Sequence, residues 1–186
     1  MSVAPRLTDG RVTLRAQQES DVEAHVRAFV DDPDLARLLG YERDTDAEEV
    51  RRRIARPYVS PPKLRSFEFA IADARDDGFL GTLMIHSCDW WNRRAEVGFW
   101  VVPWARGRGV LSGALTLVLD WAFGELRLER MELTALTDNA AVAQIARRFG
   151  FTHEGTMRKR NLERGVRVDL ELWGVLRDER RYRPGP

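Results

Sequence analysis

The feature that most constrains this chain is residues 95–112, AEVGFWVVPWARGRGVLS, which combine a strand pattern, a glycine-rich turn and a helix start. Gly107 and Gly109 leave the backbone accessible, and the first turn of a helix presents unpaired N–H groups at the positive end of its dipole. A pyrophosphate suits such a place, where Arg106 and Arg108 can add positive charge. The same glycines can equally serve only to make a tight turn, so these residues alone leave both interpretations open.

Two familiar phosphate-binding motifs do not fit this segment. The sequence G-x-x-x-x-G-K-[ST] is missing, which excludes a P-loop at this site. The G-x-G is followed by Val-Leu-Ser-Gly, one residue off the dinucleotide fingerprint. A dinucleotide oxidoreductase therefore stays only as a third hypothesis, which preferential binding of NAD(P) would support.

Hydrophobic periodicity predicts the order β-α-α-β-β-β-α-β-α-β-β. Strands are expected at about 11–15, 66–73, 79–87, 95–102, 131–136, 151–157 and 166–176, and helices at about 20–30, 45–56, 112–123 and 139–149. Ser20 with Glu23 is a capping-box pattern for the first helix, and Asp138 is expected to cap the last one, which Gly150 closes. This order predicts an α/β layer structure around a mixed sheet, and it lacks the regular alternation of a doubly wound fold.

Composition narrows the class of protein. At 186 residues, with 44% apolar and 32% charged residues, the chain is expected to form one globular domain. No apolar run is long enough to span a bilayer and no secretory signal is visible, which favours a cytoplasmic protein that does not bind membranes. Thirty basic against 29 acidic residues, interspersed along the chain, argue against general nucleic-acid binding.

Two kinds of site lack support in the sequence. The three histidines have no spacing typical of metal ligands, so no metal site is expected. Cys88 is the single cysteine and has no obvious neighbouring base, which argues against a cysteine nucleophile.

Two motifs in order carry a resemblance to a known family. The first motif is residues 96–109, EVGFWVVPWARGRG, which contain the pattern R/Q-x-x-G-x-G/A after a strand. The second is residues 138–158, DNAAVAQIARRFGFTHEGTMR, in which the helix predicted at 139–149 begins with Asn. The chain resembles the GCN5-related N-acetyltransferase (GNAT) superfamily over about residues 11–178, and within it the RimJ/RimL-like ribosomal-protein N-terminal acetyltransferases. The resemblance implies a single domain over residues 1–186, with a mostly antiparallel sheet of about six or seven strands flanked by about four helices.

The resemblance also implies a place for acetyl-CoA. The backbone of seven consecutive residues would hold its pyrophosphate: Arg106, Gly107, Arg108, Gly109, Val110, Leu111 and Ser112. Trp100 and Val101 would offer main-chain groups to the pantetheine and thioester, and Asn139 would reach the far arm of the molecule. Asn is also favourable near a helix start for purely structural reasons.

Direct acetyl transfer to an amine needs a neutral amine, a stabilised oxyanion and a protonated leaving thiolate. Glu96 is the candidate base, because strand alternation places Glu96, Gly98 and Trp100 on one face and family members often use a carboxylate on this strand. The alternative is a surface carboxylate satisfied by Arg93 or Arg94. A strand amide near Trp100 would stabilise the oxyanion.

The sequence departs from its relatives at the positions whose side chains would protonate the leaving thiolate. Many of them place Ser or Tyr where this chain has Val142 and Ala146, and neither of these side chains donates a proton. Water, Tyr41 or Tyr58 could protonate the sulfur instead. The departure also motivates a second hypothesis, a non-catalytic acyl-CoA sensor or partner subunit with the same fold.

The acceptor is expected to be a primary amine, either a protein or peptide N-terminus or a small molecule. Tyr41, Trp90 and Trp91 are candidates for its binding groove, although large aromatic residues at a sheet edge also serve packing or a subunit contact. For Asp169 and Glu171, acceptor contact and ordinary surface exposure fit equally. A homodimer is common among similar proteins.

Overall fold

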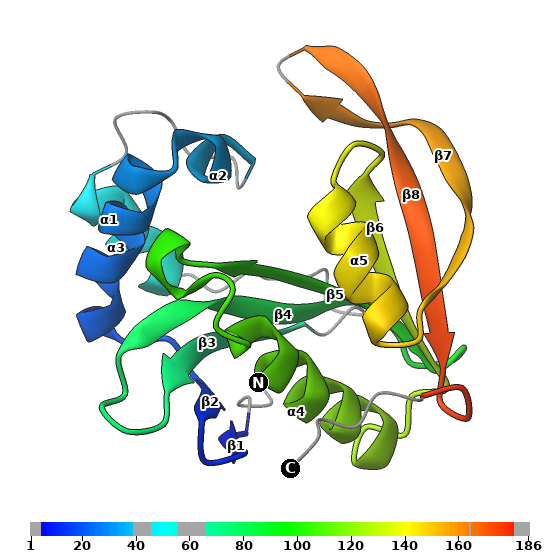
Figure 1. Ribbon diagram of the computed structural model, residues 1–186, viewed down its shortest axis with the longest axis horizontal. Helices are drawn as coiled ribbons and strands as arrows, with labels where there is room; N and C mark the ends of the chain where they lie inside the picture. The colour runs from blue at the N-terminus through cyan, green and yellow to red at the C-terminus, as the bar shows by residue number, and fades with distance from the viewer. Residues whose placement is uncertain (1–4, 39–45, 56–65, 164, 181–186) are drawn as a thin grey trace.

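A computed structural model of the chain shows a long twisted sheet with helices on both faces (Figure 1). The structure describes residues 5–38, 46–55, 66–163 and 165–180. The strands are β1 (Leu7–Thr8), β2 (Val12–Arg15), β3 (Phe67–Asp73), β4 (Phe79–Asp89), β5 (Arg94–Val101), β6 (Arg130–Leu136), β7 (Thr152–Glu163) and β8 (Val166–Leu176). The α-helices are α1 (Val22–Asp31), α2 (Pro33–Leu38), α3 (Ala47–Ala55), α4 (Val110–Gly124) and α5 (Ala140–Arg148), with 3-10 turns at Glu19–Asp21 and Pro103–Ala105.

The predicted architecture is confirmed. The eight strands lie in the order β1-β2-β3-β4-β5-β6-β8-β7, and every pair is antiparallel except β5 with β6. The sequence did not indicate β1 or α2, because elements of two and six residues are too short to show a periodic pattern. Among the described helices, none has the length and apolarity needed to cross a membrane.

The sheet divides at its parallel pair, and this division creates the site. β5 and β6 are paired only where Arg94–Glu96 meets Arg130–Glu132, and their later residues separate. We call the space between the separated strands the fork. Its closed end lies at the start of both strands, and its open end lies toward Val101 and Leu136, as Figure 1 shows.

Helices cover the two faces of the β2–β5 half differently. Trp121 of α4 packs edge-on against Phe67 and Phe69, so α4 covers the face that carries the odd-numbered residues of β3. Phe29 of α1 contacts Trp100 on the opposite face. The α4 stripe includes Leu115, Val118 and Ala122, which are almost fully buried as the helical spacing predicted.

Two of the predicted helix caps are wrong. A 3-10 turn precedes α1, and the Asp21 carboxylate, rather than the Ser20–Glu23 pair, organises it by accepting the N–H of Gln18 at 2.8 Å. Arg15 pairs with the same carboxylate at 2.8 Å, which explains how this buried charge is compensated. Thr45, the expected cap of the second helix, lies outside the described residues.

At α5 the cap is Asn139 instead of Asp138, since Asn139 Oδ1 accepts the N–H of Val142 at 3.1 Å. Gly150, with φ of 82°, closes this helix as predicted.

Candidate functional site

The loop before α4 forms an open backbone cradle. Gly107 and Gly109 adopt φ angles of 72° and 78°, a left-handed conformation that other residues rarely take. A Cβ placed on either glycine would meet no atom within 4 Å, so the space above both is open. α4 begins at Val110, two residues earlier than predicted, because Gly109 itself serves as the N-cap residue.

The first amides of α4 are available to a ligand. Within the described part of the chain, the N–H groups of Val110, Leu111 and Ser112 donate to no protein acceptor, whereas Gly113 already donates to the carbonyl of Gly109 at 3.0 Å. Unpaired amides at a helix start carry partial positive charge and favour anions. The cradle therefore has the chemistry of a phosphate site.

These amides open into a cavity of about 620 Å³ between β5, the cradle and α5. Its size is ordinary for a small-molecule site. The cavity brings together nine of the predicted residues, namely Trp100, Val101, Arg106, Gly107, Gly109, Val110, Leu111, Ser112 and Asn139.

Several lining residues were missed by the sequence analysis. They are Phe99 and Ala105, together with Ala141, Gln144, Ile145 and Arg148 of α5. The α5 residues follow the spacing i, i+3, i+4, i+7, so they form one helical stripe that begins just after Asn139. That spacing could have identified this face of the helix as a wall of the site.

Arg106 points away from the cradle's amides. Its Nη2 donates to Asp32 Oδ2 at 2.6 Å, and its Nε donates to the Val101 carbonyl at 3.1 Å. Partial burial, the largest single influence, opposes ionisation of Asp32, but the hydrogen bond and charge of Arg106 together with backbone N–H groups at Leu35 and Asp34 outweigh it and lower the pKa of that carboxyl. Arg106 thus ties the end of α1 to the cradle rather than supplying an uncommitted charge to a ligand.

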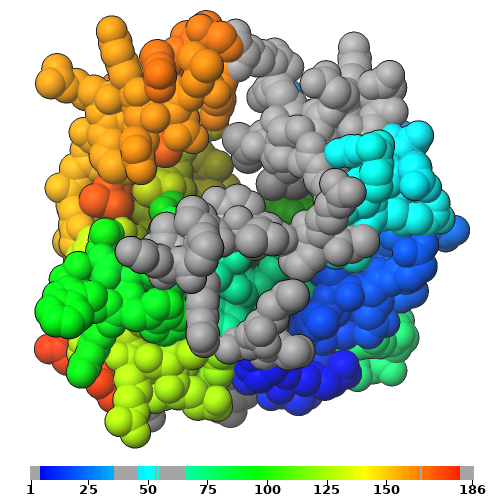
Figure 2. Space-filling model, turned by 180° about the vertical axis from the view of Figure 1, so that it is seen from behind, coloured from blue at the N-terminus to red at the C-terminus, as the bar shows by residue number. Residues whose placement is uncertain are grey.

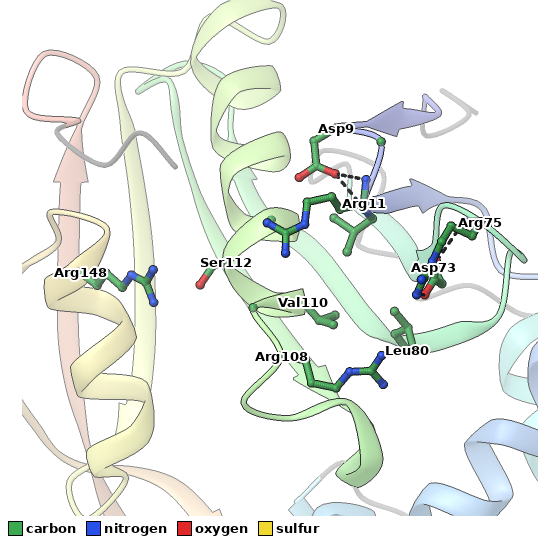
Figure 3. Close-up of a pocket in the computed structure, with 13 residues that line it drawn as sticks. Asp9, Arg11, Asp73, Arg75, Leu80, Arg108, Val110, Ser112 and Arg148 are labelled. Atoms are coloured by element: carbon green, nitrogen blue, oxygen red, sulfur yellow. Dashed lines mark hydrogen bonds and ion pairs between the residues drawn. The ribbon is translucent and has the colours of Figure 1, made fainter. Parts of the chain in front are cut away.

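Arg108 faces a second cavity, of about 590 Å³, which adjoins the first at Gly109, Val110 and Ser112. Figure 3 shows Arg11, Arg108 and Arg148 arranged around the start of α4. Arg75, at the far side, is committed to Asp73, and its hydrogen bonds lower the pKa of that carboxyl to about 2. The surroundings of the α4 start are therefore positively charged on the side outside the fork.

Glu96 lies at the closed end of the fork, at the last paired position of β5. Its Oε1 accepts the hydroxyl of Thr134 on β6 at 2.5 Å, and its Oε2 lies 4.0 Å from His86 Nδ1 on β4. The carboxylate is partly buried, with about a fifth of its side chain exposed. Both partners were missed, although His86 stands directly opposite Glu96 in the antiparallel register of β4 and β5.

The two arginines considered as partners of Glu96 bind other carboxylates. Arg93 pairs with Glu129 at 3.4 Å, and Arg94 pairs with Glu132 at 3.2 Å. The alternative of a surface Glu96 satisfied by Arg93 or Arg94 is therefore wrong, and the carboxylate is left facing the fork.

Trp100 uses its side chain and its backbone in different directions. The indole packs against His25, Phe29 and Phe79 on the α1 face. Its carbonyl points toward β4, because a Cβ on Gly81 would lie 2.2 Å from that oxygen. Since main-chain groups alternate between the two edges of a strand, those of the neighbouring residue Val101 face the fork.

The two described residues expected to bind the acceptor, Trp90 and Trp91, do not lie at the fork. Trp90 and Trp91 lie in the turn between β4 and β5, beyond its closed end. The Trp90 ring packs edge-on against Phe67, with centroids 6.4 Å apart, and Trp91 is 93% exposed. Tyr41 and Tyr58 lie outside the described residues.

Two other positions bear on the chemistry. Val142 lines the cavity and Ala146 is buried behind it, so the α5 wall offers the fork no hydroxyl at these places. Cys88 is fully buried, and burial raises the pKa of its thiol to about 11. Among the described residues, no three histidine, cysteine, aspartate or glutamate side chains form a cluster suited to a metal ion.

Comparison with known proteins gives consistent results. A family profile described as "Acetyltransferase (GNAT) domain" matches residues 11–152. "Uncharacterized N-acetyltransferase YoaA" of Bacillus subtilis (strain 168) is 25% identical over 173 residues, covering 93% of this chain and 97% of YoaA. "Ribosomal-protein-serine acetyltransferase" of Escherichia coli (strain K12) is 24% identical over 144 residues, or 77% of this chain and 80% of that protein.

A crystal structure of the acetyltransferase (GNAT family) from Bacillus anthracis superposes with a TM-score of 0.79 at 19% identity, covering 94% of this chain and all of that one (100%). At this identity the likeness establishes the fold alone.

Proposed function

The chain belongs to the acetyltransferase (GNAT) family, and from that premise we propose that it transfers an acetyl group from acetyl-CoA directly to a primary amine. The observation that supports this most strongly is the cavity that runs from the cradle amides to the neighbourhood of the fork. It joins a site for phosphate to the edge of β5 at Val101, as a long phosphorylated thioester requires.

The donor is held mainly by backbone. The amides of Val110, Leu111 and Ser112 take the pyrophosphate, and the open space above Gly107 and Gly109 lets it approach closely. Arg108 and Arg148 add charge from the rim. The pantetheine runs along β5 toward the fork.

We assign the oxyanion contact to the Val101 amide, which faces the fork, rather than to the main chain of Trp100. An amide aimed at developing negative charge stabilises the transition state without a titratable side chain.

Glu96 acts as the base. The acceptor enters the fork as an ammonium ion, loses a proton to Glu96 directly or through one water, and attacks the thioester carbon as a neutral amine. Thr134 holds one carboxylate oxygen of Glu96, and the other lies 4.0 Å from His86 Nδ1. The C–N bond forms and the C–S bond breaks, and a water takes the second proton from the attacking nitrogen and gives one to the leaving thiolate, because Val142 and Ala146 supply none.

That last step motivates a second candidate function. A chain with the donor cavity but no side chain to protonate sulfur at Val142 and Ala146 also fits an acyl-CoA sensor. Tight acetyl-CoA binding with no turnover on any acceptor would support the sensor.

The acceptor is a protein or peptide N-terminus, or a small amine. The relative named ribosomal-protein-serine acetyltransferase supports the first of these.

One pair of measurements tests the proposal. Isothermal titration with acetyl-CoA measures donor binding, and thiol release over a panel of peptides, polyamines, amino acids and aminoglycosides measures transfer. We expect micromolar binding and release of free CoA with at least one amine. Failure to bind acetyl-CoA, or preference for NAD(P), would refute the donor assignment.

A further inference from the structure

The hairpin of β7 and β8 contains a large bulge that the acetyl transfer does not explain. Met157 pairs with Leu170 and Asn161 pairs with Val168, so Arg158, Lys159 and Arg160 together oppose the single residue Asp169. A bulge of this kind turns side chains out of the regular strand alternation. Here it displays three consecutive cations.

The bulge is held by a specific contact. Lys159 has a φ of 52°, a left-handed conformation that is unusual for a residue with a side chain. Its N–H donates to the Asp169 carboxylate at 2.7 Å. From the sequence, Asp169 could equally contact the acceptor or lie exposed on the surface. In the structure its carboxylate shapes the bulge.

The charges of the bulge differ from most others on the molecule. Many arginines of the described chain are paired with carboxylates, among them Arg15, Arg51, Arg75, Arg94, Arg106 and Arg130. By contrast, no described carboxylate lies within ion-pair distance of Arg158, Lys159 or Arg160, and all three are exposed. Unpaired exposed cations in a fixed backbone arrangement are suited to an anionic partner.

The hairpin that carries the bulge extends beyond the fork. β8 pairs with β6 from Leu176 to Leu170, and the hairpin continues past the end of β6 at Leu136. The hairpin therefore rises beside the open end of the fork (Figure 1), and the bulge lies just past the end of β6, on the strand of the hairpin farther from the fork. Seen from behind, the hairpin, in orange, borders a hollow in the surface (Figure 2).

We propose that Arg158, Lys159 and Arg160 bind carboxylates of an acidic polypeptide whose N-terminal amine enters the fork. This inference rests on the proposed function, since it names the acceptor class of the same site. Guanidinium groups match carboxylates bidentately, and a chain leaving the fork would pass the bulge a few residues after its N-terminus. Nucleic acid is the less suitable partner, because the described residues next to the bulge, 157–163 and 166–171, include no aromatic ring to stack on a base.

Direct binding of two fluorescent peptides tests the proposal. Both begin with the same residue and have the same length, and one has Glu at alternate downstream positions where the other has Gln. With CoA present, fluorescence anisotropy should give a Kd about tenfold lower for the Glu peptide at low salt. The difference should shrink at higher ionic strength, because exposed charges are screened.

The variant Arg158→Gln/Lys159→Gln/Arg160→Gln should lose this preference and still bind acetyl-CoA normally. A matched triple variant of Arg6, Arg127 and Arg177 to Gln removes three exposed charges elsewhere and should keep it. Lys159→Arg preserves the charge and should also keep it.

Three results would overturn the proposal. They are equal affinity of the native protein for both peptides, the same loss of preference in the matched control, and displacement of the Glu peptide by a short RNA oligonucleotide at lower concentration than by unlabelled peptide. The anisotropy assay measures peptide binding and needs no turnover. Absence of acetyl transfer in the thiol-release assay would therefore refute the proposed function without deciding whether the bulge binds acidic peptides.

Discussion

The two sides of β5 are built in opposite ways. The donor side comes from one continuous segment, the cradle and the start of α4, with the stripe of α5 as its other wall. The proposed acceptor side is assembled from β4, β5, β6 and the distant β7–β8 hairpin, which strand pairing brings together. One side depends on backbone geometry and the other on side chains.

This difference predicts how each side responds to change. A backbone site tolerates most side-chain substitutions and fails where a glycine is lost, because the new residue disturbs the amides themselves. A side-chain site keeps its shape after one substitution and loses a chemical step. Donor affinity and turnover should therefore separate cleanly between variants of the two sides.

The largest effect is expected on the donor side, from Gly109→Val. A β-branched residue is strained at φ of 78°, and relief of that strain would turn the amides of Val110 and Leu111 away from the pyrophosphate. Loss of a few charge-assisted hydrogen bonds should weaken acetyl-CoA binding about 10³-fold by titration calorimetry. Gly124→Val, at the other end of α4, should bind normally, and normal binding by a folded Gly109 variant would contradict the cradle.

The packing of α1 against the sheet should respond to pH. His25 is buried against Phe79 and Trp100, and burial lowers its pKa from 6.5 to about 4, although a hydrogen bond with the Asp21 carbonyl opposes this. Between these two pH values the unfolded chain binds a proton that the folded protein does not, so the free energy of unfolding should fall as the pH drops. The loss is on the order of 3 kcal/mol.

Urea denaturation at pH 7 and at pH 4.5 measures this loss. His25→Gln should remove most of the His25 contribution, and His153→Gln, at an exposed site, should leave it in place. An equal pH dependence in the His25→Gln variant and the native protein would show that other groups cause it.

Glu96→Gln should reduce kcat on the order of 10²-fold at neutral pH and leave acetyl-CoA affinity unchanged, because the amide cannot accept the amine proton. The matched control is Glu132→Gln on the next strand. Glu132 is aligned with Glu96 but bound to Arg94 and Arg130, so its loss should leave the pH–rate profile almost unaltered. If Glu96→Gln also left that profile unaltered, the base would have to be another group.

The same contrast explains what the sequence could reveal. Gly107 and Gly109 are local signals that predicted the loop before α4, and hydrophobic periodicity predicted the order of most elements along the chain. The partners of Glu96 did not, because His86 and Thr134 come from two other strands and meet it only through the register of the sheet. The cationic bulge was equally hidden, since its shape depends on a contact across the hairpin.

Substitution of Asn139 is expected to give the smallest change in acetyl-CoA affinity, because this side chain has both a structural and a proposed binding role. Its Oδ1 caps α5 by accepting the N–H of Val142, while the residue also lines the donor cavity. Asn139→Asp keeps an oxygen for the cap but removes the amide N–H₂, whereas Asn139→Ala removes both and should cost about 1 kcal/mol of stability. If the amide reaches the donor, both variants should bind acetyl-CoA about tenfold more weakly, yet only the Ala variant should unfold at lower urea. Unchanged affinity in the Asp variant would assign Asn139 to the cap alone, and the donor would then depend on backbone and α5 contacts throughout.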